Sequence, residues 1–318
     1  MRIDMHVHIA DVGSIASGAQ PPFLWSNGIL ARILHKVFFS GDSPLVKGTS
    51  NTHWENQLSQ WVKESQIDKV VLLALDKVYD KDGHCQNDTT RFSVKNDLVL
   101  QSTMGNDHFL FGASIHPYRK DAINILEKVV SQGACLIKWI PSAQYIEPDD
   151  SRCLEFYEAM AHHGIPLLSH TGVEHSLGCR RTPFNHPDRL IPALKKGVNV
   201  IAAHCGTRLF LHEKSFFHSW CKLARRHENC FGDLSALPVI TRIPALRKIF
   251  SDTILQQKVV YGSDFPSFSS PLWCWQLGAK QILRLSKISN PIERNYRVMQ
   301  TLGVPDAVFR KAHSILKC

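Results

Sequence analysis

Two histidines near the start of the chain are spaced for metal binding. His6 and His8 close a short apolar run, Ile3–His8, which predicts a β-strand. Residues two apart on a strand point to the same face, so both imidazoles would project toward one point. Neutral imidazoles are ligands for Zn²⁺ and related divalent ions. The pair alone is a weak signal, because two ordinary N-terminal histidines would look the same.

Other residues with suitable chemistry follow apolar runs later in the chain. Lys138 lies in Leu-Ile-Lys-Trp-Ile-Pro, His170 in Leu-Leu-Ser-His-Thr-Gly, His204 in Ile-Ala-Ala-His-Cys-Gly and Asp264 in Val-Tyr-Gly-Ser-Asp-Phe-Pro. Gly or Pro soon follows each of them, as expected where a strand gives way to a loop. One such histidine is more often structural. Four imidazoles and a carboxylate on four strand ends together predict a metal site.

The spacing of apolar runs predicts the elements that position these residues. Besides Ile3–His8, strand-like runs occur at 70–75, 109–115, 135–140, 165–169, 198–203, 230–234 and 259–262. Helical patterns lie between them, at 122–132, 151–163, 188–197, 214–226 and 245–256. This alternation predicts parallel strands with right-handed crossovers. Eight units favour a closed (β/α)8 TIM barrel, whose chemistry lies at the C-terminal strand ends.

Two regions fall outside the eight units. Residues 10–52 form a long connection after the first strand, and apolar spacing over 24–39 predicts a helical cap over the barrel mouth. Residues 271–318 predict extra C-terminal helices packed on the outside. We therefore expect one domain over residues 1–318, with 10–52 as its insertion.

Composition limits the class of protein. The chain has 318 residues, 44% of them hydrophobic and 20% charged, which is typical of a globular protein. Nine cysteines without a CxxC pair, no apparent signal peptide and no apolar run of about 18 residues predict a reduced, cytoplasmic chain without a membrane partner. The net charge is +9, but the basic residues form no long run. We expect no nucleic-acid partner, and a homo-oligomer is left open.

The motifs resemble the amidohydrolase superfamily, and in particular its amidohydrolase-related branch of metal-dependent TIM-barrel hydrolases. The resemblance covers nearly the whole chain and includes Ala-Leu-Asp-Lys-Val-Tyr-Asp at 74–80, Gly-Ala-Ser-Ile-His-Pro-Tyr at 112–118 and Ile-Lys-Trp-Ile-Pro-Ser-Ala-Gln at 137–144. It implies that His6 and His8 are the first metal ligands, that His170 and His204 are further ligands or catalytic imidazoles, and that Asp264 is a ligand and proton acceptor. That branch also contains decarboxylases, so the fold does not settle the reaction.

The chemistry of these groups predicts a reaction. Zn²⁺ suits the ligands best, and Mn²⁺, Fe²⁺ or Co²⁺ could occupy the same set. A bound metal lowers the pKa of its water to ~7. Asp264 would take the proton as that water attacks a carbonyl and pass it to the leaving group, while His204 and the metal stabilise the oxyanion. We therefore expect a hydrolase of an amide, lactone or ester. Open alternatives are a metal-dependent non-oxidative decarboxylase of a small carboxylic acid and, in another class, an inactive binding protein.

Lys138 has three open roles. As in the binuclear proteins that this constellation resembles, it could carry a carbamate bridging two metals, with His6, His8 and Asp264 on one ion and His170 and His204 on the other. It could instead bind a substrate carboxylate beside a single metal, or pair with an aspartate. The complete ligand set favours the bridge, since a one-metal site does not need the lysine.

Substrate-binding residues are predicted near the same rim. Trp139 is next to Lys138, and Arg180 and Arg181 lie in the loop 171–187, where they could hold an anionic small-molecule substrate. Asp233, at the end of the seventh strand, could orient a ligand. The remaining polar residues near strand ends are explained about equally well by substrate contact and by loop hydrogen bonds: Asp76, Tyr79, Asp80, Ser114 and His116.

Overall fold

Eight parallel strands form the barrel in this computed structural model, which describes residues 1–9, 51–175, 177, 181–267 and 270–317. The strands are β1 (Ile3–His8), β2 (Lys69–Leu73), β3 (Phe109–Ala113), β4 (Leu136–Trp139), β5 (Leu167–His170), β6 (Val200–Ala203), β7 (Cys230–Asp233) and β8 (Val259–Val260). Each strand pairs with the next in sequence order. The amides of Met5 and His8 donate to the carbonyls of Tyr261 and Phe265 at 3.2 and 2.7 Å, which joins the two ends of the sheet. The predicted fold is confirmed.

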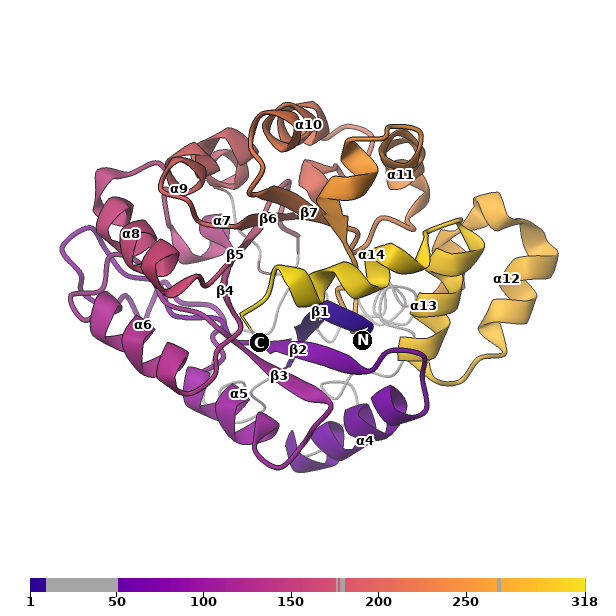
Figure 1. Ribbon diagram of the computed structural model, residues 1–318, viewed down its shortest axis with the longest axis horizontal. Coiled ribbons are helices and arrows are strands. Elements are labelled where there is room, and N and C mark those ends of the chain that lie inside the picture. The colour runs from indigo at the N-terminus through magenta and orange to yellow at the C-terminus, as the bar shows by residue number, and fades with distance from the viewer. Residues whose placement is uncertain (10–50, 176, 178–180, 268–269, 318) are drawn as a thin grey trace.

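Helices surround the strands in a ring (Figure 1). The α-helices are α4 (Asn51–Lys63), α5 (Asn96–Thr103), α6 (Ala122–Ser131), α7 (Pro141–Gln144), α8 (Leu154–His163), α9 (Ile191–Lys195), α10 (Phe217–Arg226), α11 (Ile243–Phe250), α12 (Gly278–Ser286), α13 (Pro291–Thr301) and α14 (Asp306–Lys311). Short 3₁₀ helices include η5 (His204–Gly206), η6 (Ile240–Arg242) and η10 (Ala312–Ser314). Local chemistry sets some ends: Gly164 stops α8 in the left-handed conformation, and the Asn290 side chain caps α13.

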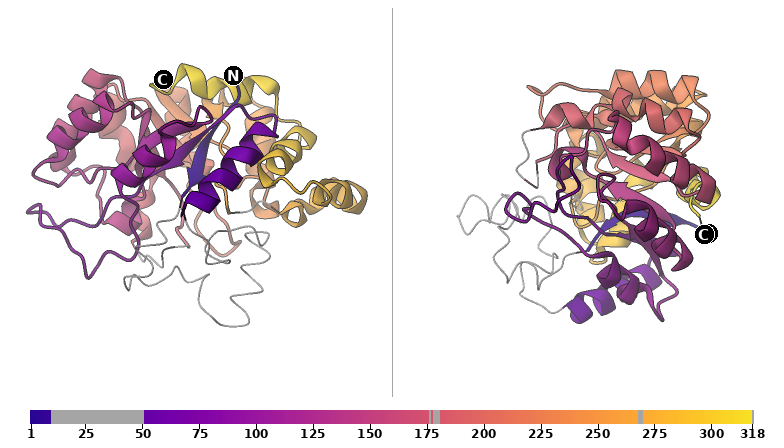
Figure 2. Two further views of the ribbon diagram at one scale, coloured as in Figure 1. Left: turned by 90° about the horizontal axis from the view of Figure 1, so that it is seen from below. Right: turned by 90° about the vertical axis from the view of Figure 1, so that its left-hand side faces the viewer.

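The barrel interior is apolar below the functional rim. Side chains from alternate strand positions fill it, including Ile3 and Met5 of β1, and they contact Ile315 and Leu316 near the C-terminus. The C-terminal segment therefore closes the N-terminal end of the barrel. Figure 2 shows both termini at that one end. A larger apolar cluster packs the outward side chains of the strands against the helices.

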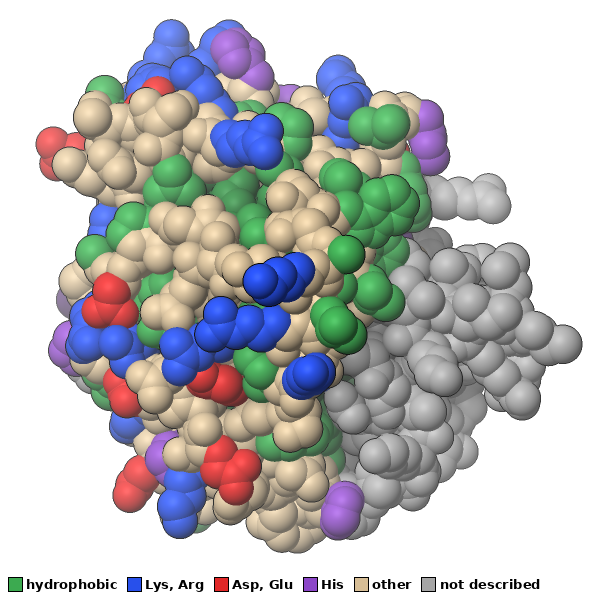
Figure 3. Space-filling view, turned by 90° about the vertical axis from the view of Figure 1, so that its right-hand side faces the viewer, with side chains coloured by type: hydrophobic (Ala, Val, Ile, Leu, Met, Phe, Trp, Pro, Cys, Tyr) green, Lys and Arg blue, Asp and Glu red, His purple; other side chains and the backbone are tan. Residues whose placement is uncertain are grey.

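The extra C-terminal helices are α12, α13 and α14, and α12 projects from the side of the barrel (Figure 1). The predicted cap at 24–39, and most of the insertion 10–52, lie outside the described residues. On the face that carries α12, basic and apolar side chains are interspersed (Figure 3). No helix in the described part of the chain is long and apolar enough to cross a membrane.

Candidate metal centre

An irregularity in β1 turns its two histidines inward. Asp4 is paired with Val70 and Val7 with Leu72, so β1 contains one more residue than β2 between these two pairs. The extra residue reverses the alternation of side chains. Met5 therefore packs inside the barrel with the apolar interior, while His6 and His8 reach the same interior one layer higher.

Three groups from the two joined edges of the sheet converge on one point. His6 Nε2 lies 3.2 Å from His8 Nε2 and 3.3 Å from Asp264 Oδ1, and His8 Nε2 lies 3.2 Å from Asp264 Oδ1. These three residues form a group whose ligand atoms all lie within 4.8 Å of one another. His204 and His170 stand beside them, with ring centroids 5.5 Å apart for His6 and His204 and 4.9 Å for His170 and His204.

Hydrogen bonds behind the imidazoles fix which nitrogen faces the centre. His6 Nδ1 donates to Asp233 Oδ2 at 2.7 Å, so its Nε2 presents a lone pair. His204 Nδ1 lies 3.0 Å from the carbonyl oxygen of Ser235, so Nε2 is the ring nitrogen that faces away from Ser235. His170 Nδ1 lies 3.4 Å from Glu174 Oε2.

Backbone conformation also aims these groups. His204 and Asp264 have φ of 60° and 65°, in the left-handed region that non-glycine residues rarely adopt. Such positions cost about 1–3 kcal/mol each and are concentrated at functional sites. Gly262 is required for close approach, since a Cβ there would lie 2.8 Å from His6 Cβ and 3.4 Å from Asp233 Oδ2.

Burial and neighbouring groups set the protonation states of the side chains in the centre. Burial lowers the pKa of His6 and His204, and that of His170 to about 4, so all three are neutral at pH 7. Burial alone would raise the pKa of Asp264, but His6 and a hydrogen bond with His8 hold it below its usual range. The centre therefore offers neutral imidazoles and a carboxylate, which is the protonation state that metal binding needs.

Lys138 reaches the same point from β4. Its Nζ lies 2.9 Å from His6 Nε2, and the side chain is fully buried. Burial lowers its pKa to about 8. The structure thus brings together all six predicted centre residues: His6, His8, Lys138, His170, His204 and Asp264.

The two predicted substrate residues that the structure describes, Trp139 and Arg181, have no contact with the centre among the described residues. Trp139 follows Lys138 on β4 and so points the opposite way: it is fully buried, donates to the Ile115 carbonyl at 2.8 Å and stacks on Phe156 of α8. It packs in the core between the outer face of the strands and the helices, and it does not line the site. Arg181 stacks over the Tyr145 ring at 4.2 Å on the C-terminal face, without a described contact to the histidines. Arg180 lies outside the described residues.

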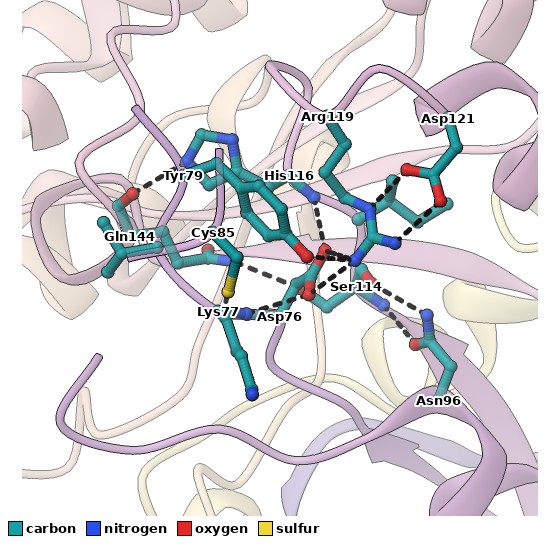
Figure 4. A network of polar contacts seen from close by, with 12 residues as sticks. Asp76, Lys77, Tyr79, Cys85, Asn96, Ser114, His116, Arg119, Asp121 and Gln144 are labelled. Carbon is teal, nitrogen blue, oxygen red and sulfur yellow. Dashed lines mark hydrogen bonds and ion pairs between the residues drawn. The ribbon is translucent and has the colours of Figure 1, made fainter. Parts of the chain in front are cut away.

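Polar groups at the ends of β2 and β3 bond mainly to one another (Figure 4). Arg119 Nη1 donates to Tyr79 Oη at 2.6 Å and lies 3.3 Å from Asp76 Oδ1. Asp76 Oδ2 also accepts the His116 amide at 2.9 Å. These contacts favour the structural interpretation of this network over substrate binding.

Two observations show that the centre fits a divalent metal. His6 Nε2 and Asp264 Oδ1 are both acceptors and lie 3.3 Å apart, an arrangement that a positive charge stabilises, whether that of the Lys138 ammonium 2.9 Å from His6 Nε2 or that of a bound metal. His170 Nε2 is buried with no hydrogen-bond partner among the described residues. A metal would satisfy these atoms at once, with His6, His8 and Asp264 as its nearest ligands.

Sequence reasoning missed three contributors to the centre. None of Glu174, Ser235 and Arg242 was assigned a role from the sequence. Ser235 and Arg242 follow β7 in a stretch without a motif, so the contact of Ser235 with His204 and the burial of Arg242 depend on the barrel. Glu174 lies four residues after His170, and this spacing was the one local signal.

Comparisons with known proteins agree with this architecture. A family model described as amidohydrolase matches residues 3–285. Similar solved structures include an uncharacterised TIM-barrel protein from Bordetella bronchiseptica, with 14% identity over 95% of this chain and 99% of that chain and a TM-score of 0.59. The 5-carboxyvanillate decarboxylase from Sphingomonas paucimobilis has 13% identity over 99% and 98% and a TM-score of 0.58. A protein named as a 2-pyrone-4,6-dicarboxylic acid hydrolase from Pseudomonas putida has 14% identity over 99% and 94% and a TM-score of 0.53. No curated protein sequence matches the chain.

Proposed function

Because this chain belongs to the amidohydrolase family, we propose that it is a metal-dependent hydrolase in which Asp264 moves the proton during attack of water on a carbonyl substrate. The substrate bond would be that of an amide, lactone or ester. The observation that carries the proposal is the convergence of His6, His8 and Asp264 within 3.3 Å of one another, at the rim where barrel enzymes hold their reacting groups.

The roles of the side chains follow from their surroundings. A divalent metal held by His6, His8 and Asp264 would supply Lewis-acid chemistry and a water of lowered pKa. Asp264 is a carboxylate at pH 7 and can accept the proton of the attacking water, then return it to the leaving group. His204 Nδ1 donates to the Ser235 carbonyl oxygen at 3.0 Å, so Nε2 of the neutral ring presents a lone pair. His204 would stabilise an oxyanion only after its Nε2 has taken up a proton during the reaction.

Decarboxylation is the second candidate. Three of the similar structures are named as decarboxylases, and their names give aromatic acids as the compounds on which they act. The same centre could polarise such an acid without hydrolysing a bond. Names of carboxylated compounds among both hydrolase and decarboxylase neighbours support an anionic substrate for this chain.

Metal binding is the first test. Chelator-treated protein is titrated with Zn²⁺ and, separately, with Mn²⁺, and metal content is measured by elemental analysis. We expect a dissociation constant well below millimolar for the wild-type protein. His6→Ala removes a proposed ligand and should bind the metal at least about tenfold more weakly. His218→Ala, which removes an exposed histidine of α10, is the control and should bind as the wild type does. Failure of the wild-type protein to bind either metal would reject the proposal.

The reaction class is tested on the metal-loaded protein. Aryl esters, lactones and N-acyl amides are compared with hydroxybenzoic acids, with release of CO₂ and of the acid product followed in parallel. Acid product without CO₂ supports hydrolysis, whereas CO₂ release from the free acid supports the second candidate.

A further inference from the structure

One buried hydroxyl joins the two chain segments that carry His170 and His204. Strands β5 and β6 are neighbours in the sheet, and His170 is paired with Ala203 (Figure 1). Thr171 directly follows His170 and is buried. Its Oγ1 donates to the Ala203 carbonyl oxygen at 2.6 Å and accepts the Gly206 amide at 2.9 Å. The hydroxyl thus bridges the residue just before His204 and the last residue of η5.

The bridged turn has an unusual backbone. His204, Cys205 and Gly206 have φ of 60°, 52° and 67°, so three consecutive residues are left-handed. Of the three, only glycine adopts this region readily, because in other residues Cβ comes too close to the following carbonyl oxygen. Without restraint, His204 and Cys205 favour other backbone conformations, in which the Cα–Cβ bond of His204 points elsewhere. The direction of the imidazole therefore depends on the contacts that hold η5.

Hydrogen bonds hold η5 from three sides. Asp233 Oδ1, from β7, accepts the His204 amide at 2.8 Å, and Thr207 Oγ1 donates to the His204 carbonyl oxygen at 2.7 Å. Thr171 holds the turn from the side of β5. Without its hydroxyl, the buried Gly206 amide loses this acceptor, and a buried donor is costly to leave unpaired. The backbone of η5 then has to move for that donor to find another partner.

The segment after β5 is packed closely against this turn. Gly172 has φ of 98°, and a Cβ there would lie 2.8 Å from the carbonyl oxygen of Thr207. This position requires glycine, because a side chain would push the two segments apart. The contact of Thr171 with η5 is therefore part of a built interface between the two segments.

We propose that Thr171 is a positioning residue for His204: its hydroxyl holds the left-handed turn that directs this imidazole toward the centre. Thr171 thereby ties His204 to the backbone that carries His170, and the two ring centroids lie 4.9 Å apart. The catalytic consequence rests on the proposed function, in which His204 takes up a proton and stabilises the oxyanion. The geometric claim requires neither turnover nor a bound metal.

NMR of chelator-treated protein with labelled histidines tests the geometric claim. The ring signals of His170 and His204 are assigned by their loss in His170→Gln and His204→Gln. The wild-type protein should show a nuclear Overhauser effect between the two rings, because the rings are in contact. Thr171→Val keeps the shape of the side chain and removes both hydrogen bonds, so this effect should disappear. Thr171→Ser keeps the hydroxyl and should retain it.

Thr90 offers a matched control. Its Oγ1 accepts the Val78 amide at 3.0 Å and donates to the Gln86 carbonyl oxygen at 2.8 Å, which is the same pattern of bonds in the loop after β2. Thr90→Val should retain the ring contact between His170 and His204. Its loss there would overturn the proposal, as would its loss in Thr171→Ser or its survival in folded Thr171→Val.

Circular dichroism shows whether each variant folds. If Thr171→Val does not fold, Thr171→Cys takes its place, because a thiol has a similar size but is only a weak donor and acceptor. The ring contact should then be weaker than in Thr171→Ser. Equal contacts in the cysteine and serine variants would overturn the proposal.

A double-mutant cycle tests the catalytic consequence on metal-loaded protein, with a substrate that the wild type converts. Thr171→Val should lower kcat by at least about tenfold and change KM by less than about twofold. In a His204→Gln background, Thr171→Val should cause no further loss, because its effect passes through that imidazole. A residue that only stabilises the fold would lower the rate equally in both backgrounds, and that result would overturn the catalytic role.

The two experiments separate this inference from the proposed function. Protein that binds no metal rejects the metal-dependent hydrolase, while loss of the ring contact in Thr171→Val still supports the positioning of His204. A metal-binding hydrolase in which folded Thr171→Val keeps the ring contact rejects the positioning role alone.

Discussion

His6 donates its Nδ1 hydrogen to Asp233 across 2.7 Å, although the two residues lie 227 positions apart in the chain. Asp233 also accepts the His204 amide at 2.8 Å through its other oxygen. One buried carboxylate therefore orients a histidine of β1 and the backbone of the segment after β6. The arrangement links the two halves of the centre through a residue that contributes no ligand itself.

Asp233→Asn should weaken metal binding. The amide cannot match a carboxylate as acceptor for His6 Nδ1, so the imidazole becomes a poorer and less fixed ligand, and Zn²⁺ affinity should fall about 10- to 100-fold. Competition with a chromogenic chelator measures the affinity. Asp121→Asn changes an aspartate that pairs with Arg119 at the surface and serves as the control. Equal Zn²⁺ affinity in Asp233→Asn and wild type would show that the contact is only structural.

Asp264→Asn should abolish turnover and spare the fold. The role proposed for its carboxylate is proton transfer, and general base catalysis is typically worth ~10²–10⁴-fold in rate. The rate is measured at saturating Zn²⁺, because the substitution also removes a ligand. Circular dichroism checks the fold. A variant that keeps more than about a tenth of the wild-type rate would refute the role.

Lys138 decides between one metal ion and two. Its Nζ lies 2.9 Å from His6 Nε2, within reach of a metal held there. The sequence-based expectation is a carbamate on Lys138 and two ions per chain. Metal stoichiometry near two, with a mass gain of one CO₂ on the intact protein that Lys138→Met lacks, would confirm it. One ion and an unmodified amine would contradict it and leave Lys138 as a cation for the substrate.

His116 should make the protein less stable in mild acid. Its Nδ1 accepts the Tyr118 amide at 3.2 Å and its Nε2 donates to the Gln144 carbonyl at 2.8 Å, so the fold holds the neutral ring. Burial lowers its pKa from 6.5 to about 4. Below about pH 6.5 the unfolded chain takes up a proton that folded His116 refuses until about pH 4, so stability is present above this window and lost as the pH falls through it.

Urea unfolding measures this effect. Wild type and His116→Gln are compared at about pH 7.5 and about pH 5, and the stability advantage of the wild type should shrink by roughly 1–3 kcal/mol at the lower pH. The comparison between the two proteins cancels the other buried histidines, which they share. An advantage that does not change with pH would mean that His116 titrates normally in the folded protein.

The sequence by itself determined the strand count and the rim. Eight apolar runs separated by helical patterns are local signals, and parallel strands in sequence order must place their C-terminal ends together. For this reason His6, His170 and Asp264 could be assigned to one site before any tertiary contact was known. Strict alternation along β4 would also have excluded Trp139, since a strand cannot direct neighbouring side chains to the same face.

Only the tertiary structure decided how the rim is aimed and what lies behind it. The extra residue in β1 moves His6 and His8 to the inner face, and the left-handed backbone at His204 and Asp264 turns two more groups toward them. Bulges and strained residues persist because neighbouring strands hold them in place. No local sequence pattern therefore predicts them. Arg242 also depends on the tertiary structure, because the barrel buries it and places its Nε against the carbonyl oxygen of Arg208, 34 positions earlier in the chain.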